Sequence, residues 1–264
     1  MAHRKLKSPV RPYRVIVQDS NDPGYVNRLL VGIPTTGLVR IEWHAAFMGL
    51  VTPVNWSRVT MTQYMNVFIP LRYQVADAQN LIVKQAVERD FEWLLLYEHD
   101  VIPPPDALMR LNRYMTGEKT PVVSGLYYTR SQPSDPLVFR GRGTGAFVDW
   151  KMGEPVWCDG APTGFMLIHS AILRAMWAES AEYAVGNEIT RRVFDTPRNL
   201  WLDPQTNQFN LNVGTSDLDW CTRVMQGGFF EKAGWHKYQA MEYPFLVDTA
   251  MFCRHIDVDG RQYP

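Results

Sequence analysis

The 264-residue chain has few cysteines, no net charge and no long apolar segment. Its three cysteines are odd in number and lack CxxC spacing, which indicates neither a disulfide framework nor a zinc cluster and favours a reducing, cytoplasmic setting. Basic and acidic residues both number 27, which disfavours a globally basic nucleic-acid binder. The apolar stretch 93–97 is far shorter than the roughly 20 residues of a membrane-spanning helix, so we expect no membrane span.

Charge is nevertheless unevenly distributed along the chain. Residues 1–14 contain five lysines and arginines and no acidic residue, which leaves 22 basic and 27 acidic residues, a charge of −5, for the rest. We therefore assign residues 1–28 to a basic N-terminal arm and lead-in, and residues 29–264 to one domain. The arm lacks the apolar segment of a secretory signal. A solvated tail is its default interpretation, and a contact with a membrane surface or with DNA is the alternative.

Strand-like and helix-like segments alternate, which predicts an α/β domain with a largely parallel sheet. The expected strands are 29–33, 91–97, 121–128 and 164–168. The expected helices are 75–89, 106–115, 171–178 and a segment that begins near residue 216. We expect the glycine- and proline-rich stretch 131–162 to form a flexible hairpin or a substrate-facing loop, and residues 183–212 to be irregular.

Two carboxylates, Glu98 and Asp100, lie at the carboxyl end of the apolar strand 91–97. Open α/β sheets bind ligands at this edge. Buried charge is costly, and a divalent cation with a bound diphosphate would offset it, because Mg²⁺ and Mn²⁺ take carboxylate and phosphate oxygens. A pair of solvated loop acids is the alternative, since an acid-x-acid pattern often occurs by chance.

Six segments follow one another in a characteristic order: residues 31–35, 78–83, 93–104, 122–127, 163–167 and 216–223. This ordered set resembles GT-A glycosyltransferases, particularly family-2-like members, over roughly residues 29–260. The resemblance implies a single GT-A (Rossmann-like) domain, with a mixed, mostly parallel sheet flanked by helices. It also implies that a nucleotide-sugar donor is held over the sheet.

The resemblance places Glu98, His99 and Asp100 at the DxD metal motif of the family, with Mn²⁺ or Mg²⁺ as the cofactor. Asp100 is the closer match, whereas Glu98 keeps the charge on a longer arm and would reach the metal, a metal-bound water or the donor ribose. His99 points to the other side of an extended chain and is interpreted as structural more readily than as catalytic. His255 is similar to the late histidine that completes the metal site in many members; a structural histidine is the alternative.

The segment from Ser216 to Trp220 resembles the acidic segment that opens a helix in the family. An aspartate there commonly acts as the base in inverting members, so we expect Asp217 to deprotonate the acceptor hydroxyl, with Asp219 as the second candidate. The alternative is that these carboxylates only complement the helix dipole.

Donor recognition is expected after the first strand and on the first long helix. The resemblance assigns the donor nucleotide to Pro34, Thr35 and Thr36, and to Asn80 of the helix 75–89. Gly164 opens a strand where the family tends to contact the donor or acceptor sugar. The chain departs from the family pattern at Gln79, where an arginine is usual.

These features predict a metal-dependent glycosyltransferase that moves a hexose from a nucleotide diphosphate sugar, with UDP favoured, to a hydroxyl acceptor with inversion. The acceptor would be a glycan, a small molecule or a modified nucleic acid. Three alternatives stay open. They are a retaining glycosyltransferase, a non-catalytic nucleotide-sugar-binding protein of the same fold, and a metallohydrolase that uses residues 98–100 and His255.

Overall fold

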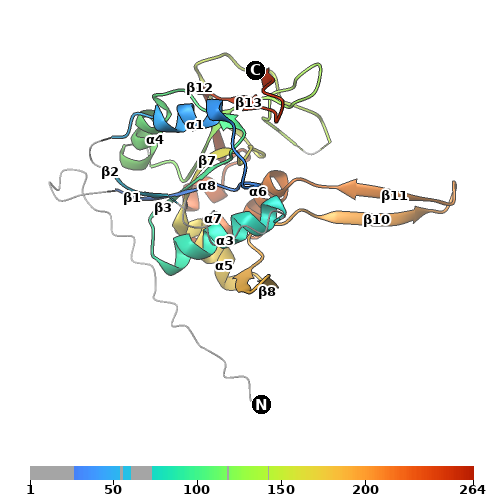
Figure 1. The fold of residues 1–264 in the computed structure, drawn as a ribbon. Helices are drawn as coiled ribbons and strands as arrows, with labels where there is room; N and C mark the ends of the chain where they lie inside the picture. The colour runs from blue at the N-terminus through green and yellow to red at the C-terminus, as the bar shows by residue number, and fades with distance from the viewer. Residues whose placement is uncertain (1–26, 54–55, 61–72, 118, 142) are drawn as a thin grey trace, which may run out of the picture.

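The computed structural model describes residues 27–53, 56–60, 73–117, 119–141 and 143–264. The proposed basic arm lies outside the described residues, except for its last two positions. The core is a seven-stranded sheet in the order β2-β1-β3-β7-β5-β12-β6 (Figure 1). Its strands are β1 (Asn27–Gly32), β2 (Trp56–Thr60), β3 (Trp93–Tyr97), β5 (Val122–Leu126), β6 (Pro155–Cys158), β7 (Phe165–His169) and β12 (Phe245–Phe252).

Most strands of this sheet run in the same direction. The pairs β1–β2, β1–β3 and β5–β12 are parallel, whereas β7 is antiparallel to β3 and to β5, and β6 is antiparallel to β12. The expected single α/β domain with a mixed, mostly parallel sheet is therefore confirmed. Because Tyr97 pairs with Phe165, the loop before β7 lies at the edge where β3 ends.

Helices cover both faces of the sheet (Figure 1). Successive side chains of β3 point to opposite faces, so that Leu94 and Leu96 join one buried cluster while Leu95 joins the other. All five residues of β3 are buried, as expected for a strand covered on both sides. One face packs against α3 (Val75–Glu88), α5 (Ser170–Glu179), α6 (Ser216–Gln226), α7 (Phe229–Lys232) and α8 (His236–Gln239), and the other against α1 (Ile41–Met48) and α4 (Ala107–Thr116).

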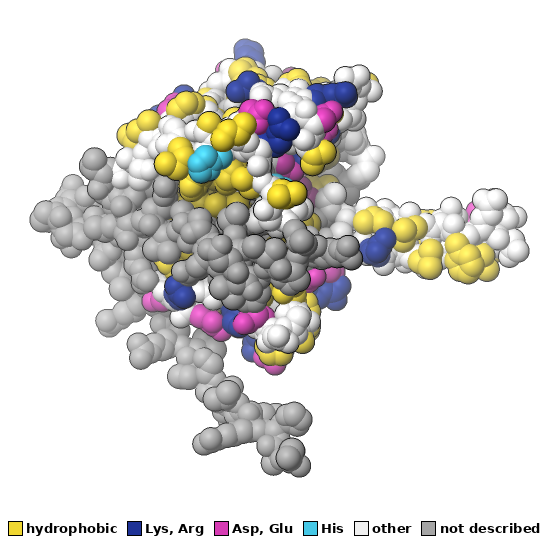
Figure 2. All heavy atoms as spheres, viewed as in Figure 1, with side chains coloured by type: hydrophobic (Ala, Val, Ile, Leu, Met, Phe, Trp, Pro, Cys, Tyr) yellow, Lys and Arg dark blue, Asp and Glu magenta, His cyan; other side chains and the backbone are white. Residues whose placement is uncertain are grey.

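The segment 183–212 is not irregular, so that expectation is wrong. It forms two antiparallel hairpins, β8 (Glu182–Val185) with β9 (Glu188–Arg191), and β10 (Arg198–Asp203) with β11 (Gln208–Val213). The β10–β11 hairpin projects from the body, and Figure 2 shows apolar side chains along it. In β11 the apolar residues Phe209, Leu211 and Val213 alternate with asparagines, and this period of two was an available strand signal.

Two short strands near the C-terminus complete the fold beside the site described below. β13 (Arg254–Ile256) lies between β4 (Val101–Ile102) and β14 (Gln262–Tyr263) in a small antiparallel sheet. The three cysteines are free and buried. Within the part of the chain that the structure describes, none of the helices has the length and apolar character to cross a membrane.

Candidate active site

Four segments that follow parallel strands meet at one edge of the sheet. The carboxyl ends of parallel strands share an edge, and ligands of open α/β sheets bind there. The segments are residues 33–36 after β1, 98–100 after β3, 127–130 after β5 and 253–256 after β12. The start of β7 reaches the same edge because this strand runs the other way. The edge therefore gathers residues that lie far apart in the sequence.

The backbone of Glu98 is held from two sides. Its N–H donates to the carbonyl of Gly164 at 2.7 Å, and its carbonyl accepts from the indole N–H of Trp43 at 2.9 Å. The Gly164 N–H donates to the Tyr127 hydroxyl at 2.6 Å. A Cβ atom at Gly164 would lie 2.5 Å from that hydroxyl oxygen, so only glycine fits this position. The expected site residue Gly164 thus lies directly beside Glu98.

Asp100 and His255 are neighbours because β4 pairs with β13. His255 is opposite Val101 in this pairing, and the Ile256 N–H donates to the Asp100 carbonyl at 2.8 Å. His255 Nδ1 donates to the Tyr128 carbonyl at 2.6 Å, which leaves Nε2 with its lone pair in the neutral ring. Burial lowers the pKa of His255, against the opposing effect of Asp100, and this favours the neutral form that binds metals.

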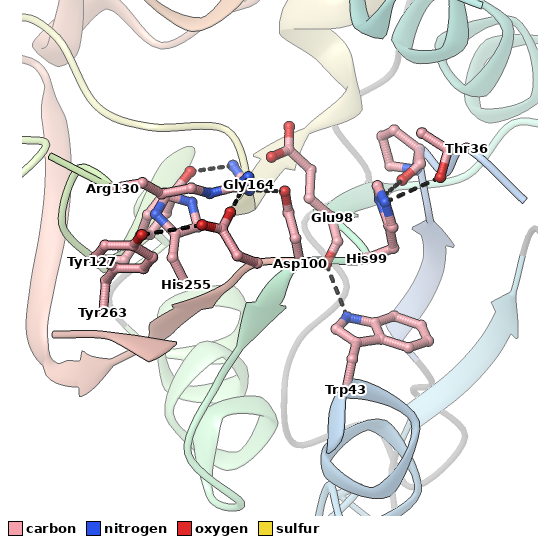
Figure 3. Close-up of polar contacts among 12 residues, drawn as sticks. Thr36, Trp43, Glu98, His99, Asp100, Tyr127, Arg130, Gly164, His255 and Tyr263 are labelled. Carbon is pink, nitrogen blue, oxygen red and sulfur yellow. Dashed lines mark hydrogen bonds and ion pairs between the residues drawn. The ribbon is translucent and has the colours of Figure 1, made fainter. Parts of the chain in front are cut away.

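Asp100 combines a satisfied oxygen with an unsatisfied one. Its Oδ2 forms an ion pair with Arg130 (Figure 3), and Arg130 also donates to Asp257 Oδ1 at 3.1 Å. Its Oδ1 is buried and has no hydrogen-bond partner within the described residues, which is unfavourable unless a cation or a water is bound. Among those residues no three His, Cys, Asp or Glu side chains converge on a common metal position. Asp100 and His255 could thus supply two ligands, with water and diphosphate oxygens as the others.

The carboxyl group of Glu98 titrates far from its ordinary range. Burial raises the pKa of Glu98 to about 8, with further contributions from the charges of Asp100 and Asp217. Burial, followed by the nearby acidic groups Glu98, Asp217 and Asp100, holds the pKa of Tyr127 well above its usual value. A protonated Glu98 donates a hydrogen bond and is a poor metal ligand until a cation lowers its pKa. A contact with a donor hydroxyl or a bound water therefore suits Glu98 at neutral pH.

The two aspartates of α6 face different surroundings. Asp217 lies in the first turn, its Oδ1 accepts from the Leu218 N–H at 2.9 Å, and its charge acts on Glu98. Asp219 lies two residues further, about 200° around the helix, and forms an ion pair with Arg223 at 3.6 Å. Burial raises the pKa of Asp219. The structure thus brings Asp217 to the carboxylate cluster and turns Asp219 toward Arg223.

His99 links the segment after β3 to the segment after β1. Its Nδ1 donates to the Pro34 carbonyl at 3.1 Å, and its Nε2 lies 3.4 Å from the Thr36 hydroxyl. Figure 3 shows that His99 is directed toward Thr36, whereas Asp100 is directed toward Arg130. The Thr35 hydroxyl accepts from the Gly37 N–H at 3.1 Å. Pro34, Thr35 and Thr36 are thus held beside the acidic segment.

The side chain of Asn80 forms hydrogen bonds to other parts of the protein. Its buried amide donates to the Tyr183 hydroxyl and to the Phe194 carbonyl, both at 2.9 Å, and accepts from the Phe194 N–H at 2.7 Å. Both amide hydrogens are therefore engaged by the segment 183–194. The neighbouring Gln79 donates to Thr163 at 3.1 Å, next to Gly164.

Sequence reasoning missed Tyr127, Arg130 and Asp257. Tyr127 lies near the end of the expected strand 121–128 and Arg130 just after it, at the carboxyl edge of the sheet, so this position was an available signal. Asp257 follows β13, a strand too short to be recognised from its sequence pattern.

The comparisons with known proteins inform the fold. No protein-family model and no curated protein matches the chain. Among solved structures, A197 from STIV aligns with 89% of this chain and 92% of its own, with a TM-score of 0.50 and 15% identity. This similarity concerns the fold alone, and the mixed α/β architecture is compatible with a GT-A-like fold.

Partial similarity extends to TarS 1–349 of S. aureus. Its structure with UDP aligns with 56% of this chain and 48% of the TarS chain, with a TM-score of 0.34 and 13% identity. The structure with UDP-GlcNAc aligns with 56% of this chain and 46% of its own, with a TM-score of 0.35 and 14% identity. This chain thus aligns with about half of the TarS chain, and the likeness is too limited to carry an argument about function.

Proposed function

We propose that the protein is a metal-dependent glycosyltransferase that uses a nucleoside diphosphate sugar, with UDP favoured, and a hydroxyl-bearing acceptor. One observation carries the proposal. Asp100, His255, Glu98 and Asp217 meet at the carboxyl edge of the sheet although they come from three separate parts of the chain. A carboxylate beside a neutral histidine suits a divalent cation, and a further carboxylate suits proton transfer.

Each residue has a defined task in this proposal. Asp100 and His255 would hold Mn²⁺ or Mg²⁺, which supplies Lewis-acid stabilisation of the diphosphate. Asp217 accepts the proton of the acceptor hydroxyl as its oxygen bonds to the anomeric carbon. The bond from that carbon to the diphosphate oxygen breaks, and its electron pair leaves with the diphosphate. Attack opposite the leaving group gives inversion.

The remaining donor contacts follow from the loops at the same edge. Pro34, Thr35 and Thr36 would contact the nucleoside, and Glu98 would contact the ribose or a metal-bound water. The acceptor is a glycan, a small molecule or a modified nucleic acid, and the cytoplasmic setting stays a prediction from the cysteine content.

A non-catalytic nucleotide-sugar-binding protein is the second candidate. It is favoured by the ion pair of Asp100 with Arg130 and by the raised pKa of Glu98, which both oppose metal binding. Turnover separates the two candidates, because a binding protein holds the donor without releasing its diphosphate.

The deciding experiment measures UDP and GDP release from a panel of nucleotide sugars, with Mn²⁺ or with EDTA. We expect Mn²⁺-dependent release from the wild type and loss of release in Asp100→Ala. The matched control is Asp106→Ala, because Asp106 forms an exposed ion pair with Arg110 on α4. Binding of a donor with no release from folded wild type would overturn the transferase in favour of the binding protein. Hydrolysis of phosphoesters by a protein that releases no UDP or GDP from nucleotide sugars would favour the metallohydrolase.

A further inference from the structure

Arg130 lies between two carboxylates that belong to different parts of the fold. Its guanidinium pairs with Asp100, which follows β3 (Figure 3), and with Asp257, which follows β13. The Arg130 side chain is 39% exposed, so solvent reaches this pair of contacts. Partly exposed ion pairs contribute little to folding stability, so stability alone does not account for this arrangement.

The two carboxylates differ in how well they are held. Asp257 is anchored, because its Oδ2 accepts from the Tyr263 hydroxyl at 3.0 Å and its N–H donates to the Arg261 carbonyl at 2.8 Å. Asp100 has a buried Oδ1 without a hydrogen-bond partner among the described residues, beside the ring of His255. A cation that entered there would compete for Asp100 and leave Asp257 unchanged.

We propose that Arg130 is a diphosphate-binding residue, which pairs with Asp100 before ligands arrive and passes to the donor diphosphate when a divalent cation binds Asp100. The inference rests on the proposed function. A cation and a guanidinium on the same carboxylate repel each other, and the diphosphate offers oxygens at the spacing that a guanidinium fork matches. Asp257 keeps Arg130 at the site during the exchange.

The exchange places a positive charge where negative charge develops. As the bond from the anomeric carbon to the diphosphate breaks, its electron pair passes to the leaving oxygen. An N–H of Arg130 donates to the diphosphate there, while the acceptor proton passes to Asp217. Donors that are already positioned stabilise such a charge more than mobile water does.

The test uses the full chain and two probes, Mn²⁺ alone and UDP in saturating Mn²⁺. Free Mn²⁺ is followed by electron paramagnetic resonance, and UDP binding by calorimetry. For Arg130→Gln we expect Mn²⁺ alone to bind several-fold more tightly, because a competing cation is removed. We expect UDP to bind about ten-fold more weakly, because a charge-assisted hydrogen bond is lost.

Two further variants make the result specific. Arg130→Lys keeps the charge without the fork and is expected to restore part of the UDP affinity. Arg110→Gln removes a guanidinium from another ion pair, on α4, and is expected to match the wild type in both assays. Thermal unfolding checks that each variant is folded.

A gain in Mn²⁺ affinity together with a loss of UDP affinity in Arg130→Gln identifies the exchange. If Arg130 had a structural role alone, its replacement would weaken the binding of both Mn²⁺ and UDP or of neither, and either result overturns the inference. If the wild type binds UDP with Mn²⁺ and Arg130→Gln binds it equally well, only this inference fails. If the wild type binds neither UDP nor GDP with Mn²⁺, the proposed function fails and this inference with it.

Discussion

Asp100 and His255 lie side by side because a two-residue strand, β4, pairs with β13 near the other end of the chain. The Nδ1–H of His255 is directed to the Tyr128 carbonyl, and this hydrogen bond orients the ring. A histidine whose second nitrogen is held by a carbonyl is typical of metal ligands.

Replacing His255 with glutamine should weaken Mn²⁺ binding by about ten-fold or more, because one of two protein ligands is lost. Mn²⁺ titration by electron paramagnetic resonance measures the effect. His236→Gln is the control, since His236 is exposed and pairs with Glu231. Equal Mn²⁺ affinity in wild type and His255→Gln would remove His255 from the metal site.

The surroundings of the two aspartates on α6 predict unequal effects of their removal. Asp217→Asn should lower the rate of sugar transfer by about 10²–10⁴-fold while UDP binding is kept, because a general base is lost. Asp219→Asn should have a much smaller effect on transfer, because Asp219 pairs with Arg223. Steady-state kinetics with the acceptor measure both variants. A greater loss of transfer in Asp219→Asn would reverse the assignment.

Gly164 should tolerate no larger side chain. A Cβ atom there would lie 2.5 Å from the Tyr127 hydroxyl oxygen and 2.9 Å from Val101, so Gly164→Ala should lower the free energy of unfolding by about 1–3 kcal/mol. Urea unfolding measures the change. Gly49→Ala is the control, because Gly49 ends α1 in an ordinary right-handed conformation and the nearest atom to a Cβ there is the Ala45 carbonyl oxygen, at 3.2 Å. Equal stability of Gly164→Ala and Gly49→Ala would contradict the close approach of position 164 to the Tyr127 hydroxyl.

His169 should make the protein less stable in acid. It caps α5 by accepting from the Ala171 N–H at 3.2 Å, and burial lowers the pKa of His169 to about 3 from its ordinary value of 6.5. Between these two values the unfolded chain binds a proton that the folded protein does not. The contribution of His169 to stability is therefore complete above pH 6.5 and decreases below it, by at most about 1.4 kcal/mol per pH unit.

Urea unfolding between pH 4 and pH 8 tests this dependence. His169→Asn keeps a capping oxygen but cannot titrate, so its stability should fall less steeply below pH 6.5 than that of the wild type. Identical slopes for the two proteins would show that folding does not lower the pKa of His169.

Local patterns were sufficient for most of the secondary structure and for part of the site. The apolar run 93–97 predicted a strand buried on both faces, and β3 is that strand. Open α/β sheets bind ligands at the carboxyl ends of their strands, so the end of this strand was enough to predict that Glu98 and Asp100 lie at that edge. The hairpins of 183–212 were missed, since their strands are short and contain many polar residues.

Contacts between distant segments set the rest of the site. Asp217 and Asp219 are the same residue type two positions apart, so the local sequence does not distinguish them. The packing of α6 places Asp217 near Glu98, whereas Asp219 pairs with Arg223. The asparagine at position 80 matched the resembled motif, yet the backbone of Phe194 engages its amide.

The chain's residue order thus accounts for the α/β class, the buried strands and the acidic edge, because periodicity and burial are properties of short segments. The pairing of β4 with β13, the Arg130 bridge between Asp100 and Asp257, and the choice between the two aspartates of α6 arise from folding. These features depend on register and packing between segments far apart in the chain, and no local pattern records such distances.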